Sequence, residues 1–177
     1  MSKVITKQYT IYTFEELSQE AKDKARQAWN EGNDLPFLQD DLREYIHEEL
    51  TARGFTVNGI STSENPSIRP LYSLSYSQGD GLMFEGSITD QKGNTYDIKH
   101  KGGMYYHEYS ADITGTDQAG ENIDTKEFEA NIYIPICIKV RDRGYDEIEY
   151  SESEEAFRET CEANEYTFLE DGTMFNE

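Results

Sequence analysis

The chain has 177 residues, a length that fits a single domain with its own hydrophobic core. It contains 36 Asp and Glu residues against 16 Lys and Arg residues, so its formal net charge at pH 7 is −20. Such acidity excludes binding to nucleic-acid phosphates or to an anionic membrane as the main activity, and it favours binding to basic protein surfaces.

The first part of the chain predicts one short strand and two helices. Residues 7–14, KQYTIYTF, are β-branched and aromatic, which is typical of a strand. Residues 15–29 carry alanines at helical spacing, and Thr13 or Ser18 can cap the start of this helix. A second helix with an apolar stripe is expected over residues 36–53.

Between residues 54 and 114 the apolar period changes to two, which predicts strands. No segment between these strands suits a crossover helix, so an antiparallel meander is favoured over parallel βαβ units. The sequence DQKGN at residues 90–94 has the composition of a hairpin turn. The five predicted strands cover residues 55–57, 71–77, 82–89, 95–99 and 104–114.

Residues 124–143 fit two structures. Branched side chains alternate from Ile132 to Val140, which indicates a strand. The spacing of Asp124 and Glu127 resembles a helical capping box, and Gly144 could close a helix there. Pro135 would cost such a helix roughly 3 kcal/mol if it were truly internal. Local propensity therefore favours a strand, with a helix as the alternative.

Residues 151–163 predict a helix capped by Ser151 or Ser153, and a short hairpin with Asp171-Gly172 at its turn is expected over residues 166–175. The chain is expected to form one α+β domain over residues 1–177, in which an antiparallel β-meander of about five strands packs with three to four helices. Its expected parts are a helical pair at about 15–53, the meander at about 55–114 and an acidic helical part at about 124–177.

The acidic surplus is concentrated in the last third of the chain. Residues 114–177 carry 18 acidic and 5 basic residues. On a helix that begins near Ser151, spacings of three and four would place four glutamates on one face: Glu152, Glu155, Glu159 and Glu162. This face is either a solvated, solubilising surface or a negative stripe that docks on a basic groove made for DNA or RNA.

The stretch YSLSYSQGDGLMF, residues 72–84, raises the question of what its Gly79-Asp80-Gly81 does. A phosphate-binding loop needs further glycines or a following Gly-Lys-Ser/Thr, and a calcium loop needs oxygen ligands where Leu82 to Phe84 stand. A tight turn or bulge is therefore predicted. The alternative is a binding hot spot formed by the turn with Tyr72, Tyr76 and Gln78.

Positive signs of an enzyme are absent from the sequence. His100 and His107, with Glu108, could meet across a hairpin, and four carboxylates surround residues 115–122, but neither set matches a known metal-binding spacing. The four carboxylates are Asp112, Asp117, Glu121 and Asp124. We therefore predict no catalytic residue, no metal site and no cofactor.

Two further features bear on the cellular compartment. Cys137 and Cys161 are the two cysteines, and neither lies in a CxxC motif, which favours a reduced, cytoplasmic setting. The sequence MSKVITKQYT lacks the apolar core of a signal peptide, and no window approaches the roughly 18 apolar residues of a membrane span.

Three motifs together resemble a family of small phage and prophage proteins. They are YTFEELSQEAKDKARQAW, YSLSYSQGDGLMFEG and SEEAFRETCEANEYTFLEDGTMF, which correspond to the family patterns FxELSxxAK, YSQGDG and NxYxFxxDG. The resemblance covers nearly the whole chain and implies no catalytic residues. It favours a helix for residues 124–143, although Pro135 and the isoleucine-rich run depart from the family pattern.

A phage origin implies a function for the acidity, because small acidic phage proteins often block host enzymes that handle nucleic acid. The leading hypothesis is a non-enzymatic inhibitor, acting in the cytoplasm of an infected bacterium, that binds a basic host protein such as a CRISPR effector nuclease by DNA mimicry. The expected contact residues are Glu149, Glu152, Glu154, Glu155, Glu159, Glu162, Tyr72, Tyr76 and Asp80. The alternatives are an antitoxin-like or regulatory binding module without mimicry, and a metal-dependent enzyme. Exposed hairpin edges and tyrosines are also compatible with a homodimer.

Overall fold

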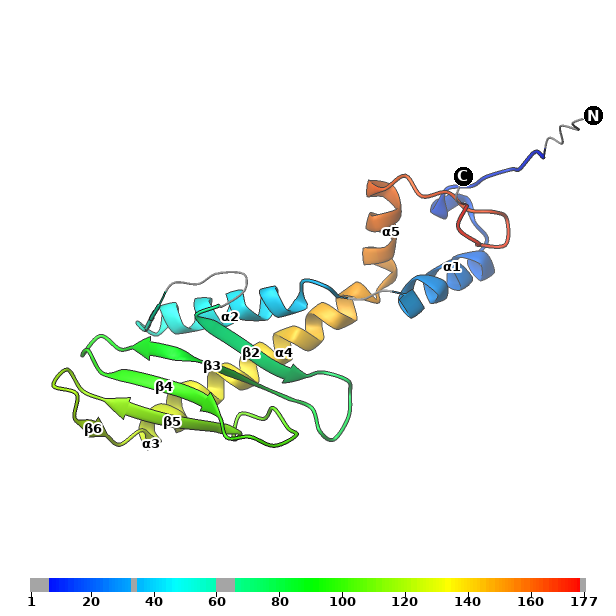
Figure 1. The fold of residues 1–177 in the computed structure, drawn as a ribbon. Coiled ribbons are helices and arrows are strands. Elements are labelled where there is room, and N and C mark those ends of the chain that lie inside the picture. The colour runs from blue at the N-terminus through cyan, green and yellow to red at the C-terminus, as the bar shows by residue number, and fades with distance from the viewer. Residues whose placement is uncertain (1–6, 33–34, 60–65, 176–177) are drawn as a thin grey trace, which may run out of the picture. The chain divides into compact units, whose positions relative to one another are not determined.

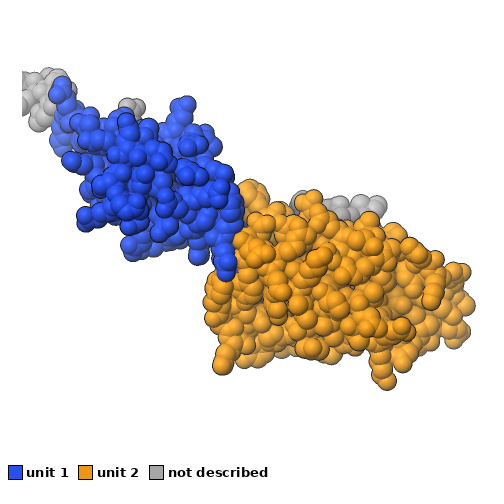
Figure 2. All heavy atoms as spheres, turned by 180° about the vertical axis from the view of Figure 1, so that it is seen from behind, with its two compact units in different colours: residues 1–35, 148–177 blue, residues 36–147 orange. Residues whose placement is uncertain are grey.

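The computed structural model describes residues 7–32, 35–59 and 66–175 (Figure 1). It confirms the predicted class, an α+β fold with an antiparallel meander. Within this fold the chain gathers into two compact units. Unit 1 comprises residues 1–35 and 148–177, and unit 2 comprises residues 36–147 (Figure 2). Each unit is described by itself.

Unit 2 is built on one antiparallel sheet. Strands β2 to β6 follow one another as a meander, and β1 pairs with the end of β3 that β2 leaves open. The register places Tyr72 opposite Leu82, and Ile98 opposite Ile113. The strands are β1 (Thr56–Val57), β2 (Ile68–Ser73), β3 (Gly81–Thr89), β4 (Thr95–His100), β5 (Ala111–Thr116) and β6 (Asn122–Ile123).

Two of the predicted strands have different bounds. The strand expected over residues 71–77 is β2, which ends at Ser73. The strand expected over residues 104–114 begins only at Ala111, because residues 101–110 form a loop. The turn expected at residues 90–94 is confirmed, since the Asp90 carboxylate accepts hydrogen bonds from the backbone N–H groups of Lys92 and Asn94.

Helices α2 (Leu38–Ala52) and α4 (Ile134–Ser151) cover one face of this sheet (Figure 1). On β4 the side chains of Tyr96 and Ile98 are buried while Asp97 and Lys99 are exposed, as expected of a sheet with one solvated face. Leucine and isoleucine side chains of α2 are fully buried beneath the sheet: Leu42, Ile46 and Leu50. The amphipathic period of β4 and of α2 thus determines the face that each one buries.

Residues 126–151 are helical, so the strand favoured by local propensity is wrong and the helical alternative is confirmed. A short helix α3 (Lys126–Phe128) leads into a π-helical turn, Glu129–Tyr133, and then into α4. Pro135 is the second residue of α4, two positions after the end of the wider turn, where a missing N–H donor disturbs the hydrogen-bond ladder least. Tyr133 is fully buried and its hydroxyl donates to the Phe84 carbonyl, 3.2 Å away, which fixes this segment on β3.

Gly144, expected to close a helix, instead lies inside α4. A Cβ atom added there would lie 2.7 Å from Leu74 Cδ1 and 3.0 Å from Leu42 Cδ2. Glycine is therefore used for close packing of α4 against its neighbours in unit 2.

Unit 1 consists of a short 3₁₀ turn η1 (Phe14–Glu16), helices α1 (Gln19–Gly32) and α5 (Glu154–Ala163), and a C-terminal hairpin. Its core is aromatic: the Phe14 and Phe157 rings are 5.0 Å apart, edge to face, and Phe168 contacts both. Ala21 and Ala25 place α1 on this cluster, with Trp29 partly buried at its border.

Capping side chains decide where the elements of unit 1 begin. The strand expected over residues 7–14 is wrong: Tyr12 makes a single bridge with Phe168, and η1 follows at once. Helix α1 begins at Gln19, after Ser18, whose hydroxyl accepts from the Ala21 N–H. The predicted helix at 151–163 begins at Glu154, because Ser151 still belongs to α4 and the Ser153 hydroxyl caps α5.

The predicted C-terminal hairpin is confirmed. Leu169 N–H donates to the Thr173 carbonyl at 2.8 Å, and Phe168 pairs with Met174. Gly172 at the turn has a φ of 83°, and a Cβ atom there would lie 2.1 Å from the Ala21 carbonyl oxygen. Only glycine fits this approach to α1.

Candidate protein-binding surfaces

The Gly79-Asp80-Gly81 turn joins β2 to β3, as the hairpin prediction requires. Asp80 is the centre of this turn, and its carboxylate accepts six hydrogen bonds. The donors are the Ser73, Ser75 and Ser77 hydroxyls, the Ser75 and Ser77 backbone N–H groups, and the Tyr145 hydroxyl of α4, at distances of 2.6 to 3.1 Å. With its oxygens occupied in this way, Asp80 holds the loop and ties it to α4.

The electrostatics of the turn agree with this structural role. Desolvation would raise the pKa of Asp80, but hydrogen bonds from Tyr145, Ser75 and Ser77 outweigh it and hold the pKa well below its usual range. Burial and the hydrogen bond to Asp80 raise the pKa of Tyr145 to about 12. Gly81 is required by packing, since a Cβ atom there would lie 2.8 Å from the Tyr106 carbonyl oxygen.

Exposed aromatic side chains lie in the two loops that meet at this end of the sheet. Tyr76, with a left-handed φ of 58°, is 62% exposed, and the 101–110 loop exposes three further apolar side chains. A Cβ atom on Gly79 would lie 3.1 Å from the Tyr105 ring, so the two loops touch. We call this set the tyrosine surface: Tyr76, Met104, Tyr105 and Tyr109. Tyr72, by contrast, is partly buried, and burial raises its pKa.

Sequence reasoning placed Tyr76 in a hot spot and missed the other three members of the tyrosine surface. The run from Met104 onward was interpreted as a strand, in which its aromatic residues would alternate between faces. The sequence signal for this loop is the pair Gly102-Gly103 near its start, because glycine is unfavourable within a strand; in the structure the two residues have φ values of 88° and 110°.

The outer face of α5 carries three exposed glutamates, Glu155, Glu159 and Glu162, which we call the acidic stripe. Phe157 and Cys161 are buried on the opposite side of the helix, so the helical period turns the acidic stripe to solvent. The prediction of one acidic helical face thus holds for these three residues. The fourth predicted member, Glu152, precedes α5 in a turn, and Glu149 belongs to α4.

Few cations lie near the acidic stripe. Unit 1 has 16 acidic and 6 basic residues in its sequence, a net charge of −10. Among its described residues, ion pairs join Lys22 to Glu15, Lys24 to Asp171 and Arg26 to Glu154, and none reaches the stripe. Glu159 accepts a hydrogen bond from the Tyr150 hydroxyl at 2.8 Å. Because the hydroxyl is neutral, this bond does not compensate the negative charge of Glu159.

The predicted contact residues therefore fall into two groups. Those of the acidic C-terminal part lie in unit 1, and Tyr72, Tyr76 and Asp80 lie in unit 2. Glu154 forms an ion pair with Arg26 at 3.8 Å, and the Asp80 carboxylate already accepts hydrogen bonds within unit 2. The acidic stripe, with the neighbouring Glu149 and Glu152, and the tyrosine surface remain as the two candidate surfaces.

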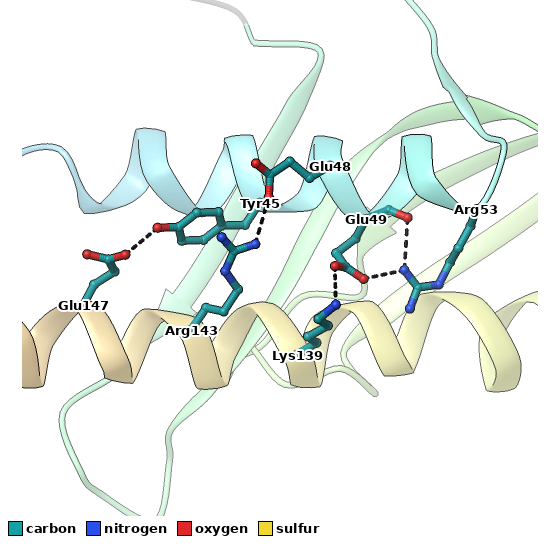
Figure 3. A network of polar contacts seen from close by, with 7 residues as sticks. All are labelled: Tyr45, Glu48, Glu49, Arg53, Lys139, Arg143 and Glu147. Atoms are coloured by element: carbon teal, nitrogen blue, oxygen red, sulfur yellow. Dashed lines mark hydrogen bonds and ion pairs between the residues drawn. The ribbon is translucent and has the colours of Figure 1, made fainter.

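Two acidic residues of unit 2, Glu48 and Glu49, are ion-paired between α2 and α4 (Figure 3). Glu49 is only 7% exposed and lies between Arg53 and Lys139, with Lys139 Nζ 2.5 Å from its carboxylate. Desolvation would raise the pKa of Glu49, but its hydrogen bonds with Lys139 and Arg53 lower it overall.

One turn further along, Arg143 joins the same two helices. Its guanidinium lies 3.4 Å from the centre of the Tyr45 ring and donates to Glu48 at 2.8 Å. The Tyr45 hydroxyl donates to Glu147, and this hydrogen bond, with burial, raises the pKa of Tyr45 to about 12. These contacts hold two helices together and expose no reactive group, so their role is structural.

The weak metal candidates are not assembled in the structure. The His100 ring donates from Nε2 to the Tyr105 carbonyl at 3.0 Å, and the Asp117 carboxylate caps its own turn by accepting from the Ala119 and Glu121 N–H groups. Over the described ranges, no group of three or more His, Cys, Asp or Glu side chains is placed to hold a metal ion. Within the same ranges, no helix combines the length and apolar character needed to cross a membrane.

Comparisons of the chain with protein-family models, curated proteins and solved structures find no match.

Proposed function

We propose that this chain is a non-enzymatic protein that binds a basic protein surface through the acidic stripe of α5. The target is a nucleic-acid-binding host defence protein, such as a CRISPR effector nuclease, in the cytoplasm of a bacterium infected by a phage. The observation that carries the proposal is the unneutralised charge of Glu155, Glu159 and Glu162 on an exposed helical face of unit 1.

The spacing of the stripe supports mimicry of a nucleic acid. Carboxylates four and three residues apart on a helix are separated by about 6 and about 4.5 Å along its axis. A DNA strand carries one phosphate charge per about 3.4 Å, so the stripe has about two thirds of the charge density of a single strand. A channel that binds phosphates would be attracted to this helix over a long range, and salt would weaken the attraction.

The proposal can be tested by reversing charge in two matched triple variants. Glu155, Glu159 and Glu162 of the acidic stripe are changed to Lys in one variant. Glu44, Asp97 and Asp112, which are exposed residues of unit 2, are changed to Lys in the other. Both variants alter the net charge by the same amount. Each is titrated into DNA-cleavage reactions of a panel of CRISPR effector nucleases, and affinity is measured against NaCl concentration.

Reversal at the stripe should weaken inhibition of the susceptible nuclease about a hundredfold and flatten its salt dependence, whereas the unit 2 variant should differ from the wild type by about threefold or less. Equal losses in the two variants would show that only total charge matters. Full inhibition by the stripe variant at moderate salt would overturn the mimicry.

The tyrosine surface favours a second function, that of an antitoxin-like or regulatory module which binds its partner without mimicry. Tyr105 is 54% and Tyr109 63% exposed, and exposed tyrosines are common anchors of protein interfaces. In this case Tyr105→Ala and Tyr109→Ala would abolish binding while the stripe variant would bind normally. Binding measurements on the tyrosine variants and on the stripe variant therefore separate the two functions.

A further inference from the structure

Beside the acidic stripe, unit 1 contains a groove of about 340 Å³ between the start of η1 and the C-terminal half of α5. Its floor is apolar: Phe14 and Cys161 are 3% and 4% exposed and Tyr166 is partly buried. This volume lies at the lower end of the range for ligand sites, and it suits one long side chain better than a cofactor.

Carboxylates outnumber cations around this groove. Glu15, Glu162 and Glu165 border it together with Arg158, and Lys22 neutralises Glu15 at 3.3 Å. No ion pair in the described part of the chain reaches Glu162 or Glu165. The rim therefore keeps a negative charge above an apolar floor.

The position of the two glutamates at the C-terminal end of α5 strengthens the negative potential of the rim. Glu162 lies in the last turn of the helix and Glu165 follows it, and this last turn contains no basic residue. Unsatisfied carbonyl groups give a helix C-terminus a partial negative charge, so cations are favoured there and carboxylates are not. A cation supplied by a partner would satisfy both the helix end and the two glutamates.

We propose that the groove receives one arginine side chain of the basic partner. The aliphatic stem packs on Phe14 and Cys161, and the guanidinium lies between the Glu162 and Glu165 carboxylates, against the Tyr166 ring. Arginine fits better than lysine because its planar, weakly hydrated head stacks on aromatic rings and bonds to two carboxylates at once. This inference rests on the proposed function, since it names how the basic partner is anchored.

The experiment compares two peptide probes of equal charge. One is hexa-arginine, and the other is a hexamer of 2-amino-3-guanidinopropionic acid, whose guanidinium is carried on a stem two methylenes shorter. The full chain, labelled with ¹⁵N, is titrated with each peptide, and backbone amide shifts are followed by NMR. Hexa-arginine should bind about tenfold more tightly and should shift the amides of Phe14 and Tyr166.

Other results identify which of the two proposals fails. Equal affinity for both peptides, with amide shifts confined to Glu155 and Glu159, would overturn the proposal that the groove binds arginine. Cation binding by the stripe would still stand. The absence of any amide shift on α5 would overturn the arginine proposal and would also remove the support for the proposed function.

Two matched double variants provide the control. Glu162→Gln with Glu165→Gln removes two charges at the groove, and Glu155→Gln with Glu159→Gln removes two charges on the outer face of the same helix. The first pair should reduce the tenfold preference for the longer stem to about twofold, because the guanidinium loses its anchor. The second pair should weaken both peptides equally and leave the preference unchanged. A preference that survives in the groove variant would overturn the proposal.

Discussion

The two units carry the same net charge, but the α2–α4 pair of unit 2 and helix α5 of unit 1 use their acidic residues differently. Unit 2 has 20 acidic and 10 basic residues in its sequence, a net charge of −10, which equals that of the much smaller unit 1. In unit 2, Glu48 and Glu49 are ion-paired across α2 and α4. In unit 1, the acidic stripe of α5 reaches no cation among the described residues.

This difference separates acidic residues that build the fold from those that are available to a partner. A buried carboxylate requires a hydrogen-bonded cation, because desolvation of an unpaired charge is costly. An exposed carboxylate has no such requirement, so its place on a surface can be set by binding. Net charge alone does not distinguish these cases, whereas the pairing of each carboxylate does.

The largest effect is expected from Glu49→Ala, which removes the buried partner of Lys139 and Arg53. Unit 2 should lose about 2 kcal/mol of stability, less than for a fully buried pair because Lys139 is 56% exposed and can be rehydrated. Urea unfolding followed by hydrogen exchange in α2 measures this loss. Glu44→Ala, at an exposed position of the same helix, is the control and should change stability by about 0.5 kcal/mol or less.

The pH dependence of this variant has a definite sign. The pKa of Glu49 is lowered in the folded protein, so its stabilisation is present above the unfolded pKa of about 4.3 and is lost as the pH falls through the folded pKa. The stability of wild type and variant should therefore converge in acid. A difference that persists undiminished at low pH would contradict the ionic role of Glu49.

A smaller effect is expected at the Asp80 turn from Tyr145→Phe. The variant removes the shortest of the six hydrogen bonds to Asp80, at 2.6 Å, and should lower the melting temperature by about 3 °C. Carboxyl ¹³C NMR should show the depressed pKa of Asp80 rising toward its ordinary value, so that the turn loses stability at a higher pH on acidification.

Tyr109→Phe serves as the control for the turn, because Tyr109 is 63% exposed and its hydroxyl makes no hydrogen bond to Asp80. It should leave both the melting temperature and the pKa of Asp80 unchanged. If the two variants behaved alike, the turn would not depend on α4.

The sequence predicted well those parts of the fold that rest on local chemistry. The hairpins at residues 90–94 and 166–175 and the cap at Ser153 follow from Asp, Gly and Ser side chains that bond to their own backbone. The acidic stripe was also predictable, because helical spacing alone places Glu155, Glu159 and Glu162 together.

The parts that failed depend on tertiary contacts. Residues 132–140 alternate like a strand, and burial of Tyr133 against Phe84 together with the π-helical turn before Pro135 makes them helical instead. The pairing of Glu49 with Lys139 joins residues 90 positions apart, so no local pattern predicts it. The groove beside α5 likewise combines η1 with the far C-terminal part of the chain.

The smallest effect is expected from Glu162→Gln, which tests whether the acidic stripe lowers the stability of unit 1. Glu162→Gln should stabilise unit 1 by about 0.3 to 0.5 kcal/mol, because it removes a carboxylate from the unfavourable C-terminal turn of α5 and relieves repulsion with Glu159. Trp29 is the single tryptophan and its ring lies 5.5 Å from that of Phe157, so its fluorescence reports unfolding of unit 1. The gain should shrink as NaCl screens the charges.

Glu154→Gln makes the same chemical change at the opposite end of α5, where the sign of the effect should reverse. Glu154 lies in the first turn, which favours a negative charge, and it pairs with Arg26 at 3.8 Å, so the variant should destabilise unit 1 by a similar amount. Destabilisation by both variants would mean that the stripe contributes to folding and would weaken its assignment to a partner. A stabilising Glu162→Gln that also loses cation binding would show that this charge is retained for binding at the expense of stability.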